Sequence, residues 1–237
     1  YDLDNEVHEV RALVSRGVDG LVLVGTSHRE DVYRLLQHKS IPYVNTWSFH
    51  HDAPHPCVGF DNRQVAFRIT QYLLDLGHRR IGAISGILKD NDRASERVAG
   101  INQALADRGQ TMPPEWLIER RYSVSSGRAA FRQIMSIGTR PTAIICGNDV
   151  LAFGAVIEAQ AMGFNIPSDI SITGFDDLEL SSQISPSLTT AHVPVEDMGR
   201  AAAEYLLARI DDIITPERTE LEVRLIVRET TGPVATP

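Results

Sequence analysis

Polar and aromatic side chains follow several short apolar runs of the sequence. Such runs predict buried strands, and the ligands of parallel sheets bind beyond the carboxyl ends of the strands, where loops lead into helices. Carboxylate and amide groups bind hydroxyls, a guanidinium binds hydroxyls or carboxylates, and aromatic rings offer flat apolar faces. This chemistry suits a small polar ligand such as a sugar or a sugar acid. The candidates at these positions are Thr26, Trp47, Arg97, Asn148 and Asp176.

Each candidate also has a purely structural interpretation. Asn148 and Asp176 could cap helices. Arg97 could be a solvated helix residue, and Trp47 could be a half-exposed residue of the core. The residue types alone leave these alternatives open.

Catalytic and metal-binding patterns give little support to an enzyme. The sequence contains no Gly-x-Ser-x-Gly, no His-Glu-x-x-His and no P-loop motif. The histidine-rich segment 50–56 has some metal-binding chemistry, but its two prolines favour a solvated loop. We therefore expect no catalytic residues, no metal and no cofactor.

The elements that would position the candidates alternate along the chain. Helical spacing is clearest over 61–76 and 148–162, where apolar residues recur on one face. Alternating strands and helices predict an α/β fold with parallel sheets covered on both faces. Strands are expected at 18–24, 41–46, 81–85, 143–146, 170–174 and 219–227. Further helices are expected at 5–15, 29–38, 93–108, 126–137 and 195–210.

The composition of the chain limits the kinds of molecule that it can bind. The formal net charge of -8 makes the chain a poor nucleic-acid binder, so any DNA contact must come from another segment. No apolar run approaches the ~20 residues of a membrane helix. Cys57 and Cys146 lie in apolar runs, so we expect two buried free thiols and a reducing cytoplasm.

Short motifs follow one another in a characteristic order over nearly the whole chain. The most specific is 166–177, which ends in Gly-Phe-Asp-Asp. Each motif alone is weak evidence, but their order and spacing together resemble the lac/galactose repressor family. The other motifs are Gly17–Leu23, Leu76–Ile81, Arg97–Gly100, Pro141–Ile144, Asn148-Asp149, Ala152–Ala155, Pro186–Thr190, Pro194 and Val227–Thr231.

The resemblance implies a fold like that of the periplasmic binding proteins. Two doubly wound parallel-sheet lobes would be joined by three chain crossings, near Phe60, His192 and Leu221. The N-terminal lobe would comprise 1–60 with 193–220, and the C-terminal lobe 61–192 with 221–233. An effector between the lobes would bias their relative orientation.

The family's effector contacts map onto individual residues of this sequence. Trp47 departs from the family pattern, because some members have an aspartate there, and the surrounding sequence resembles gluconate-type repressors. Arg93, one helical turn before Arg97, adds a second cation that would favour an anionic effector. The contacts implied by the resemblance are Thr26, Trp47, Arg93, Arg97, Tyr122, Asn148 and Asp176.

The resemblance also implies segments that this sequence does not contain. Family members carry a DNA-binding headpiece and then a first strand, helix and second strand, whereas this chain starts at the following helix. We therefore expect it to be part of a longer native chain whose headpieces, paired in a homodimer, bind operator DNA.

Three functions compete at this point. The resemblance favours the effector-sensing, dimerising core of a cytoplasmic repressor. A periplasmic sugar-binding protein of a transporter shares the fold, so the fold alone does not separate the two. An α/β enzyme would need a nucleophile, a base and an orienting group in one cleft, and the sequence shows no such set.

Overall fold

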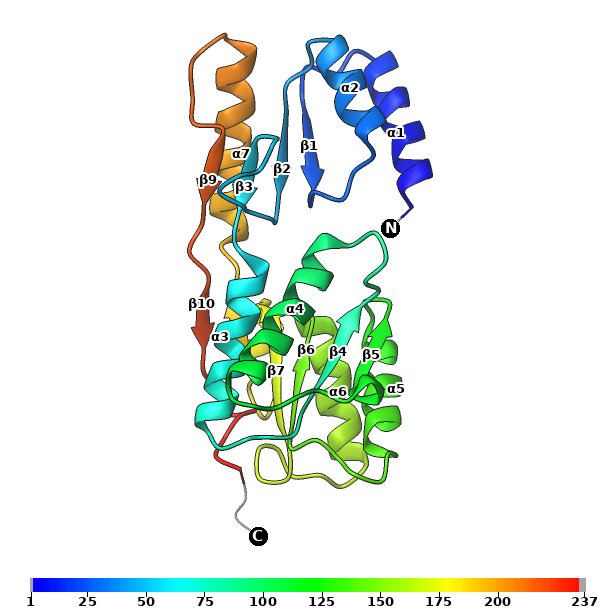
Figure 1. The fold of residues 1–237 in the computed structure, drawn as a ribbon, viewed down its shortest axis with the longest axis vertical. Coiled ribbons are helices and arrows are strands. Elements are labelled where there is room, and N and C mark those ends of the chain that lie inside the picture. Colours follow the sequence, from blue (N-terminus) through cyan, green and yellow to red (C-terminus); the bar gives the residue numbers. More distant parts are fainter. Residues whose placement is uncertain (1, 235–237) are drawn as a thin grey trace. The chain divides into compact units, whose positions relative to one another are not determined.

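The alternation of apolar runs and amphipathic segments produces two α/β units (Figure 1). The computed structural model describes residues 2–234 of the chain. Unit 1 comprises Tyr1–Asn62, Lys89–Arg93 and Pro194–Glu222, and unit 2 comprises Arg63–Leu88, Ala94–Val193 and Val223–Pro237. The α/β class and the parallel-sheet lobes expected from the sequence are confirmed.

Unit 1 contains a four-stranded parallel sheet in the order β1-β2-β3-β9. Apolar side chains of α1 and α2, including Val10, Val32 and Leu36, pack with Leu23 of β1 into one core. The strands are β1 (Leu21–Val24), β2 (Tyr43–Thr46), β3 (Cys57–Gly59) and β9 (Arg218–Glu220), and the helices are α1 (Leu3–Ser15), α2 (Glu30–His38) and α7 (Val195–Ile210).

Strand β1 lies at the edge of this sheet although its sequence, Leu-Val-Leu-Val, is typical of a central strand. On its paired side, the backbone N–H groups of Leu21 and Gly25 donate to the carbonyls of Pro42, just before β2, and of Thr46 in β2. Val22 and Val24, at the alternate positions, are 49% and 47% exposed. The apolar edge of β1 is therefore open to solvent in the part of the chain that the structure describes.

Unit 2 contains a six-stranded sheet in the order β10-β8-β7-β6-β4-β5, in which only β10 is antiparallel to its neighbour. Helices α3 and α4 cover one face and α5 and α6 the other (Figure 1). The strands are β4 (Ile81–Gly86), β5 (Leu117–Arg120), β6 (Ala143–Cys146), β7 (Ser171–Asp176), β8 (Thr189–His192) and β10 (Arg224–Ile226). The helices are α3 (Asn62–Asp75), α4 (Asp92–Asp107), α5 (Val124–Met135) and α6 (Asp149–Ala161), with short 3-10 turns at Pro114–Trp116 and Glu179–Ser182.

All seven predicted helices are present, with ends within two residues of the prediction. The single late strand predicted over 219–227 is wrong: this segment forms β9 and β10, which pair in different sheets. The reason is that the chain passes from unit 1 to unit 2 after Glu222, so one continuous strand cannot serve both sheets.

The prediction of two buried free thiols is confirmed. Cys57 and Cys146 are buried and unpaired. Burial raises the pKa of both thiols. Among residues 2–234, no helix combines the length and apolar character needed to cross a bilayer.

Candidate functional site

Asp176 ends β7 with a backbone conformation that is unusual for any residue except glycine. Its φ is 120°, and that of Asp177 is 58°. The Asp176 side chain is half-buried, and its carboxylate accepts no hydrogen bond from residues 2–234. Burial raises the pKa of Asp176 to about 7; nearby Arg97 opposes this rise and Asp149 adds to it. Backbone strain and an unsatisfied carboxyl group are both typical of binding sites.

Asp149 fixes the loop that follows Asp176. Its side chain is fully buried, and it accepts hydrogen bonds from the backbone of Leu178 at 2.8 Å and from the hydroxyls of Ser181 and Thr190 at 2.6 Å each. Burial raises the pKa of Asp149 despite these bonds. A side chain at Gly174 would begin 2.1 Å from the Asp149 carboxylate, so only glycine fits there. In the sequence, Asp149 stood out only as part of the Asn148-Asp149 motif.

Arg97 of α4 lies against the same end of the sheet. Its Nη1 atom donates to the carbonyl oxygen of Gly147 at 2.5 Å. Its guanidinium carbon lies 3.6 Å from the centroid of the Phe175 ring. The residue is only 8% exposed, so the interpretation of Arg97 as a solvated helix residue is wrong.

Asn148 is both a helix cap and a possible ligand contact. Its Oδ1 atom accepts the backbone N–H of Leu151 at 2.9 Å, which confirms the capping interpretation. The cap uses only the oxygen of the amide. The Asn148 NH₂ group, which offers two donors, has no acceptor among residues 2–234.

Tyr122 lies across the end of β4. It is 40% exposed, and a Cβ atom at Gly86 would lie 2.1 Å from its hydroxyl oxygen, so the ring packs directly on the glycine. Gly86 in turn lies beside Gly147, which precedes Asn148. Unit 2 therefore brings four of the predicted residues to the carboxyl edge of its sheet: Arg97, Tyr122, Asn148 and Asp176.

The three candidates of unit 1 also lie near the carboxyl ends of strands. Thr26, after β1, donates its backbone N–H and its hydroxyl to one oxygen of Asp92, at 2.9 and 3.0 Å. The hydroxyl of Ser48 donates to the same oxygen at 2.7 Å. Asp92 thus joins the ends of β1 and β2 to the start of α4, a role that sequence patterns did not indicate.

Arg93 makes two polar contacts within unit 1. Its Nη1 atom lies 2.9 Å from the second oxygen of Asp92 and donates to the carbonyl of Val24 at 3.0 Å. Burial would raise the pKa of Asp92, but hydrogen bonds from Ser48 and Thr26 and the charge of Arg93 outweigh it and lower this pKa. The positive charge of Arg93 is therefore balanced by a buried carboxylate.

Trp47 follows β2 with a φ of 68°, a conformation that is rare for a bulky residue. Its backbone N–H donates to the sulfur of Met198 at 3.3 Å, and its carbonyl accepts from Asn62 at 2.7 Å. The half-buried indole contacts the edge of the Phe60 ring. Both sides of the peptide are held by other elements, which maintains the strained conformation.

The histidine-rich loop shows no metal-binding geometry. Among the described residues, no group of three or more His, Cys, Asp and Glu side chains could hold an ion. His55 instead stacks on Tyr33, with ring centroids 3.5 Å apart, and bonds the Tyr43 hydroxyl at 2.9 Å. Burial lowers the pKa of His55, so its ring is neutral in this aromatic cluster.

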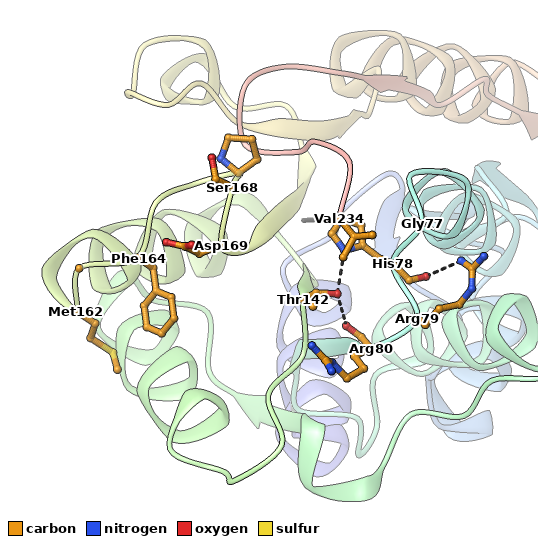
Figure 2. A pocket seen from close by; sticks show the side chains of 12 residues that line it. Gly77, His78, Arg79, Arg80, Thr142, Met162, Phe164, Ser168, Asp169 and Val234 are labelled. Carbon is orange, nitrogen blue, oxygen red and sulfur yellow. Dashed lines mark hydrogen bonds between the residues drawn. The ribbon is translucent and has the colours of Figure 1, made fainter. Parts of the chain in front are cut away.

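A pocket of about 660 Å³ lies elsewhere in unit 2 (Figure 2). It is formed by the turns 77–80 and 162–169 together with Thr142 and Val234. Strands β4, β6 and β7 begin beside these segments, so the pocket lies at the edge of the sheet opposite Asp176. None of the predicted contact residues lines it.

Comparisons with known proteins agree on one family. Residues 70–231 match the model of the periplasmic binding protein-like domain. The "HTH-type transcriptional repressor PurR" of Aliivibrio salmonicida is 34% identical over 89% of this chain, and this chain spans 63% of that relative's length. The transcription regulator GntR from Chromobacterium violaceum has a TM-score of 0.90 and 31% identity, with 98% of this chain and 85% of that chain covered. A complex of the transcriptional regulator CelR with cellobiose has a TM-score of 0.83 and 29% identity, with 94% and 69% covered.

Proposed function

Because this chain belongs to the lac-repressor family of transcription regulators and forms its periplasmic-binding-protein-like core, we propose that it senses a small sugar or sugar acid. The ligand would contact Thr26 and Trp47 of unit 1 and Arg97, Tyr122, Asn148 and Asp176 of unit 2.

The observation that carries this proposal is the half-buried carboxyl group of Asp176, which lies at the same edge of the sheet as Arg97 and Asn148 and is under the electrostatic effect of Arg97. The carboxylate accepts hydrogen bonds, and the Asn148 amide donates them. Neighbouring hydroxyls of a sugar both donate and accept, so this pair of groups matches them. The cellobiose bound to the related regulator CelR supports a sugar as the class of ligand.

The charge of the ligand depends on the arginines. Arg93 is balanced by Asp92, which weakens the argument for a second cation. The charge of Arg97 lowers the pKa of Asp176, so Arg97 is the arginine that could attract an anionic ligand at this site. Because Asp176 loses its proton near neutral pH, a sugar acid would bind best where Asp176 is protonated, whereas a neutral sugar would not require this.

The whole protein would be a repressor that acts as a homodimer in the cytoplasm. A chain with a net charge of -8 is unsuited to phosphate contacts, so operator DNA would be bound by a segment outside this sequence. Two such segments in a dimer would bind the two half-sites of an operator. The transporter alternative is not favoured, because the relatives are transcription regulators.

Thermal unfolding in the presence of candidate ligands tests the proposal. The panel contains cellobiose, glucose, gluconate, glucose 6-phosphate and hypoxanthine. A compound that binds only the folded state adds about 2.7 kcal/mol at one hundred times its dissociation constant. We expect either a shift with a neutral sugar that is lost in Asp176→Asn, or a shift with gluconate that Asp176→Asn keeps and Arg97→Ala loses, because asparagine matches the uncharged form of Asp176. A shift with hypoxanthine alone, or a shift with a neutral sugar that survives in Asp176→Asn, would contradict the proposed ligand or site.

A further inference from the structure

Asp177 bonds two residues that come much later in the chain. Its Oδ1 atom accepts from the guanidinium of Arg228 at 2.7 Å, and its Oδ2 atom lies 3.0 Å from Nδ1 of His192. The Asp177 and Arg228 side chains are 15% and 18% exposed, which limits screening of this ion pair by water. We call Asp177, His192 and Arg228 the Asp177 clamp.

The clamp connects to the ends of two segments of unit 2. His192 is the last residue of β8, two residues before the chain enters unit 1. Arg228 follows β10, which begins soon after the chain returns. Arg228 is itself fixed, because its side chain donates to the Leu188 carbonyl at 2.8 Å and its backbone N–H donates to Thr189 at 2.9 Å.

The backbone at Asp176 and Asp177 needs such support. Both residues have positive φ values, which residues other than glycine hold only where the surroundings fix them. On the C-terminal side, the bond from Leu178 to Asp149 holds the loop. At Asp177 itself, the two side-chain contacts of the clamp are the ones that oppose relaxation of the turn.

We propose that Asp177 is a positioning residue of the effector site, whose bonds to His192 and Arg228 hold the strained turn that presents the Asp176 carboxyl group. The inference rests on the proposed ligand role of Asp176. Asp177 itself does not contact the ligand in this scheme. It ties the ligand-binding carboxyl group to the two segments through which the chain leaves and re-enters unit 2.

The test measures the titration of Asp176 by carbon NMR of the labelled carboxyl groups, without any ligand. If the clamp is released, the turn relaxes towards water and the burial that raises the pKa of Asp176 is lost. We expect the Asp176 midpoint to fall by about one pH unit or more in Asp177→Ala. Asp177→Asn removes the same charge but keeps the shape and can still accept from Arg228 through Oδ1, so its midpoint should fall less than that of the alanine variant.

Two further variants separate the clamp from simpler effects. Asp177→Gly tolerates a positive φ but lacks both contacts, so it should behave like the alanine variant. Arg228→Gln removes a positive charge near Asp176, which by charge alone would raise the midpoint. Release of the turn would lower it, so the sign of the change identifies the cause. Far-ultraviolet circular dichroism and the unfolding temperature confirm that each variant is folded.

Defined outcomes would overturn the inference. One is an unchanged Asp176 midpoint in folded Asp177→Ala. A second is an Asp176 midpoint in Asp177→Gly equal to that of the parent, because the fall in Asp177→Ala would then come from the positive φ that alanine tolerates poorly. A third is a raised Asp176 midpoint in Arg228→Gln. Because this titration needs no ligand, its result is independent of the ligand panel. Binding lost in Asp176→Asn but unaffected in Asp177→Ala would likewise support the proposed function and refute the clamp.

Discussion

The guanidinium of Arg97 lies 3.6 Å from the centroid of the Phe175 ring and donates to the carbonyl of Gly147. Phe175 precedes Asp176 on β7, and Gly147 precedes Asn148 after β6. One side chain of α4 therefore links the two strand ends that carry a carboxylate and an amide. Its stacking and its hydrogen bond fix the guanidinium before any ligand arrives.

This arrangement predicts that Arg97→Lys is not a conservative change. Lysine keeps the charge but cannot stack as a plane or make paired hydrogen bonds. We expect the free energy of unfolding to fall by about 1 kcal/mol, since cation–π contacts contribute about that much. We also expect ligand affinity to fall at least about tenfold, the loss of a charge-assisted bond. Urea unfolding and calorimetric titration measure the two effects. Arg63→Lys, at an exposed position of α3, is the control; equal losses in both variants would contradict the assignment.

The raised pKa of Asp176 predicts a pH-dependent stability. The folded protein keeps this proton up to about pH 7, whereas the unfolded chain loses it near 3.8. Stability therefore falls as the pH rises between these values and is constant above them. Asp176→Asn removes this dependence, so it should stabilise the protein by up to about 4 kcal/mol at pH 8 and hardly at all at pH 4. Urea unfolding at both pH values tests this, with exposed Asp107→Asn as the control. Equal effects at both pH values would refute the titration.

The packing of Tyr122 on Gly86 predicts a variant that affects binding more than folding. A methyl group at Gly86 would occupy the position of the Tyr122 hydroxyl. Because this side chain is 40% exposed, it can swing aside at little cost in stability. Gly86→Ala should therefore leave the unfolding temperature nearly unchanged and weaken binding of the ligand found in the panel. Tyr122→Ala should weaken it similarly, and the double variant no further. Additive losses would show that the two residues act separately.

His78, at the back of the pocket in Figure 2, predicts a pH effect of the opposite sign. Its ring contacts the hydroxyls of Thr142 and Ser171 and the carbonyl of Gly232. Burial lowers the pKa of His78, so below pH 6.5 the unfolded chain binds a proton that the folded protein rejects. Stability is thus lost as the pH falls. His78→Gln should flatten the acid side of the stability curve in urea titrations. An unchanged slope between pH 5 and 7 would contradict this.

The sequence predicted the helices well because each presents one apolar face over several turns. It missed β3, β5 and β8, which have three or four residues each and, unlike the equally short β1 and β6, are not continuous apolar runs. These strands exist because neighbouring strands complete their hydrogen bonds. The break between β9 and β10 depends on which unit each half joins, and a local pattern does not contain that information.

The candidate residues could be identified, but not their contacts. Family motifs and strand ends together selected Arg97, Asn148 and Asp176. Nothing local marked Asp92, because its partners Thr26 and Ser48 are more than forty residues away in the sequence. Asp92 also balances Arg93, its neighbour in the sequence, but adjacency in the sequence does not show that the two side chains meet. Residue type shows what a side chain can bind, whereas the tertiary fold decides what it does bind.

The open edge of β1 has a consequence for handling residues 1–237 as a separate polypeptide in solution. An apolar parallel strand with half-exposed valines offers a backbone template on which another extended chain can pair. Self-association through this edge should increase with protein concentration and involve intermolecular strand pairing. A lysine at Val22 would place a charge on that template, as natural edge strands do. Light scattering of Val22→Lys against the parent would then report a more slowly aggregating protein with the same fold.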